Sequence, residues 1–214
     1  LTGVWAEENT REEIYEAFRR KETFATSGPR IKVRFFSGYD FENADINDLE
    51  LVKKAYGGNL SMGSTISIEQ AKEPKFLVWA FADPLGAPLQ RIQIIKGWME
   101  NGEHQEKVYD AVCSDGLVVN SSTHRCPDNG AKVNIETCEV TQNSGASELK
   151  SFWLDPDFLM DQRAFYYVRV LENPVCRWST WDSIREGVEP RSDIPSTIQE
   201  RAWTSPIWFE PTNS

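Results

Sequence analysis

The chain has 214 residues, of which 40% are hydrophobic and 12% aromatic, and its formal net charge is −10. The apolar content excludes a disordered chain, and no apolar run approaches the roughly 20 residues of a membrane-spanning helix. The negative charge makes nucleic acid and anionic lipid poor partners, since the basic residues are scattered among carboxylates. We therefore expect a folded protein with no membrane span and no nucleic-acid partner.

Residues 1–29 show a strand–helix–strand pattern. Thr10 and Glu13 form a capping box ahead of an amphipathic pattern, which predicts a helix over residues 10–21. The apolar segment GVW precedes this helix, and the segment TFATS at residues 23–27 reads as the next strand. Because this order is typical of a βαβ unit, we interpret residues 1–29 as the C-terminal end of an α/β barrel domain.

Residues 30–214 are dominated by β-strand patterns. Asn101 and Gly102 separate two apolar runs, and such a pair predicts a hairpin because both residues accept the positive φ of a type I′ turn. We expect a short helix over 49–56, a long connection over 187–206, and strands over 30–36, 75–83, 89–99, 107–113, 163–172 and 207–210. This pattern predicts a mainly β fold, an antiparallel β-sandwich that forms an accessory domain.

Four cysteines are present, Cys113, Cys126, Cys138 and Cys176, and none has the CxxC spacing of a zinc ribbon or a redox site. We therefore expect disulfides and a periplasmic or secreted location. The turn-rich loop between Cys126 and Cys138 favours a bridge between these two, which leaves Cys113 for Cys176. The other pairings stay open, and the alternative is free buried thiols in a reducing compartment.

Four segments carry a resemblance to a known family: GVWAEENTREEIYEAFRRKETFATSGPRIKVRFF, LQRIQIIKGW, RAFYYVRVLENPVCRWSTWD and TIQERAWTSPIWF. They resemble the C-terminal part of a large bacterial family of unknown function, which itself resembles the polymerase and histidinol phosphatase (PHP) superfamily of metal-dependent hydrolases. The resemblance implies a phosphoesterase-like parent protein that holds a divalent metal, zinc, manganese or iron, on His-rich motifs of its barrel.

Those motifs do not occur in this sequence. Its two histidines, His104 and His124, lie in polar segments, and neither belongs to an HxH pair. We therefore expect no metal or other cofactor in this chain, and we expect its partner to be the N-terminal barrel domain of the same protein. The substrate of that protein is a small molecule that the sequence leaves undefined.

Three residues are weak candidates for catalysis. If GVW is a barrel strand, Glu7 and Glu8 fall in the βα loop, where barrel enzymes carry their active sites. Arg30 follows the next strand, and its planar fork of donors suits phosphate or carboxylate. The simpler interpretation is that Glu7 and Glu8 only complement the positive end of the helix dipole and that Arg30 forms a surface ion pair.

The tryptophans suggest a different class of function. Those within strand patterns are expected in the core. Trp178 and Trp181, three residues apart in RWSTWD, are the best candidates for a surface pair that stacks on a sugar or another ligand.

Three hypotheses follow. The first is the C-terminal fragment of a PHP-like hydrolase, lacking the metal site and supporting the barrel. The second is an autonomous ligand- or carbohydrate-binding β-sandwich, and the third is a self-sufficient hydrolase that uses Glu7, Glu8 and Arg30. The helix separates the first two, because a fragment leaves Ile14 and Phe18 exposed as an apolar surface whereas an autonomous module buries them.

Overall fold

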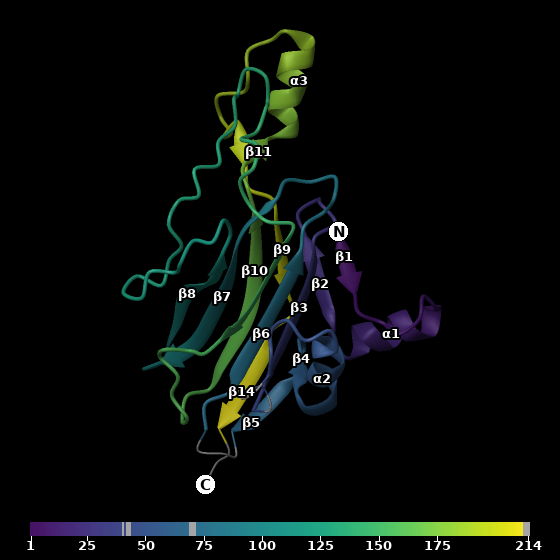
Figure 1. The fold of residues 1–214 in the computed structure, drawn as a ribbon, viewed down its shortest axis with the longest axis vertical. Coiled ribbons are helices and arrows are strands. Elements are labelled where there is room, and N and C mark those ends of the chain that lie inside the picture. Colours follow the sequence, from purple (N-terminus) through teal and green to yellow (C-terminus); the bar gives the residue numbers. More distant parts are fainter. Residues whose placement is uncertain (40, 42–43, 69–71, 212–214) are drawn as a thin grey trace.

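Two β-sheets face each other across a shared hydrophobic core in the structure, a computed structural model that describes residues 1–39, 41, 44–68 and 72–211 (Figure 1). Helices lie at the periphery of these two layers. None of the helices in these ranges has the length and apolar content of a membrane span. The predicted mainly β, sandwich-like architecture is confirmed.

The larger sheet has eight strands, with β10 near its centre. The strand β7 pairs with one edge of β10 and leads to β8, whereas β13 and β14 share the other edge. From there β13 leads to β2 and β1, and β14 leads to β5 through a parallel pairing. The strands are β1 (Thr2–Val4), β2 (Thr23–Thr26), β5 (Thr65–Ile68), β7 (Leu89–Glu100), β8 (Glu103–Cys113), β10 (Ala164–Glu172), β13 (Arg201–Thr204) and β14 (Ile207–Pro211).

The smaller sheet is antiparallel and has the order β4-β3-β6-β9. Its strands are β4 (Leu60–Ser61), β3 (Lys32–Gly38), β6 (Lys75–Phe81) and β9 (Glu148–Trp153). Alternation along β3 buries Val33 and Phe35 and turns Lys32 and Arg34 to the outer face, as the sequence pattern predicts. The outer face of this sheet is therefore the one that can carry polar groups.

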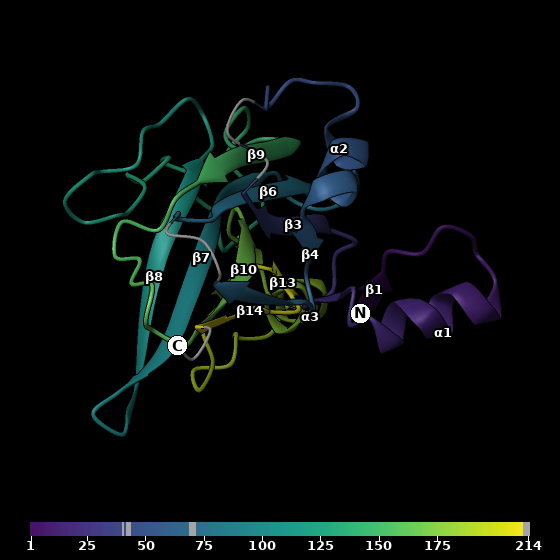
Figure 2. The same cartoon turned by 90° about the horizontal axis from the view of Figure 1, so that it is seen from below.

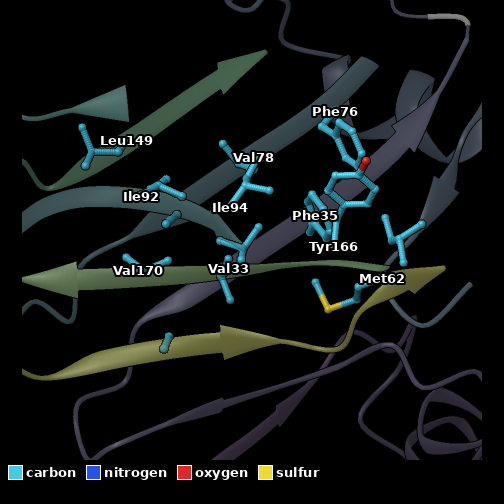
Figure 3. Packing of buried hydrophobic residues seen from close by; sticks show 14 of the residues in the cluster. Val33, Phe35, Met62, Phe76, Val78, Ile92, Ile94, Leu149, Tyr166 and Val170 are labelled. Carbon is cyan, nitrogen blue, oxygen red and sulfur yellow. The ribbon is translucent and has the colours of Figure 1, made fainter. Parts of the chain in front are cut away.

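The main core fills the space between the two sheets. Phe35, Phe76 and Tyr166 lie close together there (Figure 3), and the rings of Phe76 and Tyr166 are 4.8 Å apart. Each large apolar side chain buried in this way contributes about 1.5–3 kcal/mol to stability. The core thus fixes how the two sheets stack.

The helix α2 (Leu51–Gly58) covers only one part of the outer face of the smaller sheet (Figure 2). A second apolar cluster forms there from Phe36, Phe41, Leu51, Ala55 and Leu77. The remaining part of that face, where Lys32 and Arg34 project, is not under this cluster.

The hairpin between β7 and β8 is confirmed. Asn101 and Gly102 have φ angles of 52° and 82°, the positive values that their turn needs. The expected helix at the N-terminus also forms as α1 (Arg11–Arg19), with the Thr10 hydroxyl accepting a hydrogen bond from the Glu13 amide at 3.3 Å. Local sequence chemistry therefore sets both features.

The N-terminal strand–helix–strand unit differs from a βαβ unit in strand direction. The strands β1 and β2 are antiparallel neighbours, with Thr2 opposite Ala25 and Val4 opposite Thr23, whereas a βαβ unit joins parallel strands. The strand β2 also pairs with β13, so residues on both sides of the expected boundary at residue 29 belong to one sheet. The barrel origin of residues 1–29 stays a prediction.

All four cysteines form disulfides, but the favoured pairing is wrong. Cys113 bonds to Cys126, and Cys138 bonds to Cys176. After β8 the chain folds back on itself, and the Cys126 amide donates to the Asp110 carboxylate at 2.6 Å, which brings Cys126 beside Cys113. This return of the chain is a tertiary contact that loop composition does not reveal.

The segment expected as a long connection also contains regular structure. The strand β13 lies within it and pairs with both β10 and β2, while β12 (Thr197–Ile198) pairs with β11 (Val175–Cys176). A further helix, α3 (Trp178–Glu186), follows β11 and ends at Gly187, whose φ of 63° suits a left-handed cap. The Cys138–Cys176 disulfide ties this end of the molecule to the loop before β9.

Candidate functional site

A groove of about 1510 Å³ occupies the open part of the outer face of the smaller sheet. Its floor is formed by outward side chains of β3 and β6, and its walls by Trp5, by the loop of residues 82–88 and by residues 143–148. It is larger than the roughly 300–1,000 Å³ of typical small-molecule sites. The groove thus has room for an extended ligand.

The strand register arranges the floor in rows. Lys32 lies opposite Phe81, and Arg34 lies opposite Trp79. Side chains opposite each other on one face of an antiparallel pair lie about 5 Å apart, so each basic group has an aromatic neighbour. The floor therefore alternates positive charge with flat apolar rings.

Trp5, on the wall of the groove, stacks on Arg34 of the floor. The Arg34 guanidinium lies 3.6 Å from the centre of the Trp5 ring, and the Trp5 indole donates to the Val33 carbonyl at 2.8 Å. Arg34 also donates to the Tyr56 hydroxyl at 3.0 Å. Burial, together with the Glu22 carboxylate that accepts from this hydroxyl, raises the pKa of Tyr56 to about 12. The Tyr56 hydroxyl consequently stays protonated at physiological pH.

Trp79 is held in place by the neighbouring strand. Its indole nitrogen donates to the Glu148 carboxylate at 2.7 Å, and the Lys150 ammonium lies 5.1 Å from its ring centre. The ring of Phe81 is 5.4 Å from that of Trp79 and tilted by 35°. Two aromatic rings therefore present a pre-ordered apolar surface on the floor.

The free positive charges of the groove belong to Arg30 and Lys32. Within the described part of the chain their side chains form no hydrogen bond or ion pair, and both residues are exposed. The Asp83 carboxylate instead accepts the backbone amides of Arg30 and Leu85 at 2.6 and 3.0 Å, which lowers its pKa. The nearby acidic group is thus engaged by the backbone, and the basic side chains are available to a ligand.

Of the three predicted catalytic residues, only Arg30 belongs to this groove. Arg30 lines the groove, whereas Glu7 and Glu8 lie exposed in the loop between β1 and α1 and are not among the residues that line it. A catalytic role for these three residues stays a prediction.

Trp178 and Trp181 lie on α3, one helical turn apart, with exposed fractions of 74% and 36%. The Arg185 guanidinium is 5.8 Å from the ring centre of Trp181. Neither tryptophan lines the groove, and α3 lies at one end of the molecule (Figure 1). They form a separate aromatic surface, and ligand binding there stays a prediction.

Sequence reasoning missed Trp5 and Phe81 as site residues and expected Trp79, as a strand tryptophan, in the core, against which it packs only partly. The alternation of strand residues between the two faces of a sheet could have found Trp79 and Phe81. Val78 and Ala80 are buried, so Trp79 and Phe81 must point to the opposite face. Because the residues on both faces of this strand are apolar, the sequence does not show which face is buried.

A second polar cluster lies inside the protein. The Lys96 ammonium donates to the Asp155 carboxylate and to the Asp157 carbonyl, each at 2.7 Å, and the Tyr166 hydroxyl donates to Asp155 at 2.7 Å. Burial raises the pKa of Tyr166 above its ordinary value. Asp155 is thus satisfied by protein donors, which suits a structural role.

Among the described residues, no three His, Cys, Asp or Glu side chains are grouped as metal ligands would be.

Comparison with known proteins identifies the family. The model of DUF3604, described as a protein of unknown function, matches residues 1–211. No curated protein and no solved structure matches the chain. The predicted membership of a family of unknown function is confirmed: the chain belongs to the DUF3604 family.

Proposed function

We propose that the chain is a non-catalytic accessory β-sandwich domain of a PHP-like, metal-dependent hydrolase, and that it packs against the barrel domain of the same protein. The observation that supports this proposal is the exposed aromatic surface of α1. The divalent metal, zinc, manganese or iron, and the phosphoesterase-like chemistry belong to the barrel. A periplasmic or secreted location fits the two disulfides.

The helix α1 extends away from both sheets (Figures 1 and 2). It buries Ala17 completely, but Tyr15 and Phe18 are 57% and 50% exposed. Ile14 is only partly buried. Clustered apolar side chains on a protruding helix are typical of a surface that another protein layer covers. The exposed ring of Phe18 supports the fragment hypothesis, whereas Ile14, the other residue that this hypothesis names, is partly covered within the chain.

The aromatic pair on α1 also suits a partner that carries charge at its rim. Arg19 lies 6.0 Å from the ring centre of Tyr15, and the exposed residues Arg11 and Glu12 lie one helical turn before Tyr15. Such a patch, apolar at its centre and charged around it, has the composition of a domain interface. Glu7 and Glu8, next to this helix, would contact the same partner.

The test compares this chain with the full-length protein. Metal content and hydrolysis of an aryl phosphate are measured for both, and we expect metal and turnover only in the full-length protein. Stoichiometric metal in this chain would contradict the proposal.

The interface is tested separately in the full-length protein. The double variant Tyr15→Ser, Phe18→Ser should raise amide hydrogen exchange along the barrel surface that contacts α1. The control is Trp178→Ser, which removes an exposed aromatic ring from α3. Equal exchange in both variants would exclude α1 as the interface.

The groove favours a second candidate function, a ligand-binding module. Aromatic rings meet there with basic side chains that have no ion pair among the described residues, and such a surface suits a saccharide that carries acid groups. Both functions can coexist, because α1 and the floor of the groove are different surfaces.

A further inference from the structure

We propose that the groove binds a segment of an anionic saccharide chain, whose sugar rings stack on Trp79 and Phe81 and whose acid groups pair with Arg30 and Lys32. This inference rests on the second candidate function, ligand binding, and does not require docking of a barrel domain.

The aromatic floor selects a ligand with flat apolar faces. The Trp79 indole is oriented by its hydrogen bond to Glu148, so its ring needs little reordering on binding. The C–H faces of a sugar ring match such a surface, and an aromatic side chain pre-ordered in this way loses little rotamer freedom.

The charges select for acid groups on that ligand. The protein as a whole carries a net charge of −10, yet Arg30, Lys32 and Arg34 all line this groove. Arg34 is already bound to Tyr56 and stacked on Trp5, which leaves Arg30 and Lys32 to the ligand. A carboxylate or a sulfate would satisfy either of them by a charge-assisted hydrogen bond.

The spacing of these charges argues against a nucleic acid. Duplex DNA carries one negative charge per about 1.7 Å, and its binding depends on many phosphate contacts. Here three basic side chains alternate with aromatic rings, and Glu148 and Asp83 lie beside them. Sparse acid groups on a chain of sugar rings fit this pattern better than a dense polyphosphate does.

The experiment is isothermal titration calorimetry of this chain with three probes of equal length: tetragalacturonate, a sulfated tetrasaccharide and neutral cellotetraose. We expect an anionic probe to bind at least about tenfold more tightly than the neutral one and to weaken as salt increases. The tighter of the two anionic probes identifies carboxylate or sulfate as the acid group. Equal affinity for all three probes, or no binding to any of them, would overturn the proposal.

Groove variants then locate the site. Trp79→Ala and the double variant Arg30→Gln, Lys32→Gln should each weaken binding by about three- to tenfold, a change within the range expected for one stacking contact or for two exposed ion pairs. Trp208→Ala, which removes a strand tryptophan outside the groove, and Lys53→Gln, on the exposed surface of α2, serve as matched controls and should bind as the parent does. Unchanged binding by the double variant, whose side chains are exposed and leave the core intact, would refute the placement even if Trp79→Ala misfolds.

The same titration on the full-length protein separates a ligand site from a covered surface. Binding by both proteins supports the proposal. Binding by this chain alone would show that the barrel occupies the groove, which would overturn the proposal for the native protein. Neither result alters the metal and turnover measurements, so the two proposals fail independently.

Discussion

Glu172 gives the sharpest prediction about stability. This residue ends β10, is 1% exposed, and its Oε1 has no hydrogen-bond partner within the described part of the chain. Burial, together with the nearby charges of Glu200 and Asp83, raises its pKa from 4.5 to about 7, although the Ala87 amide partly opposes this. The folded protein therefore keeps a proton on Glu172 that the unfolded chain releases near pH 4.5.

The sign and size of the effect follow from linkage. Between pH 4.5 and 7 the folded state binds more protons than the unfolded state, so the contribution of Glu172 to stability is fully present below pH 4.5 and is lost as the pH rises through 7. At about 1.4 kcal/mol per pH unit, the total loss is about 3 kcal/mol. Glu172→Gln keeps the shape of the protonated acid and cannot ionise, so it should escape this loss.

The assay is urea denaturation at pH 4.5, 6, 7 and 8. We expect the free energy of unfolding of Glu172→Gln, measured relative to the parent, to rise by about 3 kcal/mol between pH 4.5 and pH 8. Glu103→Gln, a change at the exposed carboxylate that begins β8, is the control and should follow the parent at every pH. Parallel pH curves for Glu172→Gln and the parent would refute the reasoning.

Three further changes test the packing. Lys96→Met leaves the Asp155 carboxylate buried without its cation. We expect this change to lower the free energy of unfolding by about 3–5 kcal/mol in urea titration. A loss below about 1 kcal/mol would show that the pair is not buried in solution. Replacing Cys138 and Cys176 by Ser should lower the free energy of unfolding by up to about 4 kcal/mol. Peptide mapping of the parent protein without reductant should recover these two cysteines in one linked pair of peptides. A peptide pair linked through Cys126 and Cys138 would contradict the structure. Phe18→Ser in this chain should change stability by less than about 0.5 kcal/mol in the same titration, since the ring is half exposed, and a larger loss would mean that α1 packs within the chain.

Features set by neighbouring residues could be predicted from the sequence. The Thr10 cap, the Asn101–Gly102 turn and the alternation around Lys32 depend on residues within a few positions of one another. The β-rich class follows from the same local patterns summed along the chain. These predictions hold because the packing of the two sheets favours the same local conformations as the neighbouring residues do.

The groove could be predicted only in part. The guanidinium donors of Arg30 make this residue a candidate from the sequence alone, and it lines the groove. Trp5 reaches the groove because its indole bonds to the Val33 carbonyl, 28 residues away, and Glu148 orients Trp79 across a separation of 69 residues. No local sequence pattern indicates contacts between residues so far apart in the chain.

The sequence by itself determined the fold class, the positions of most strands, the helix α1 and the presence of disulfides. Tertiary structure decided which cysteines pair, that β1 and β2 run antiparallel, and that Arg201–Thr204 forms a strand between β10 and β2. It also decided that scattered basic residues share one groove. The physical reason is that strand pairing and disulfide choice depend on contacts between residues far apart in the chain. Forming such contacts costs the entropy of closing the loops between them, and only the packed core offsets this cost.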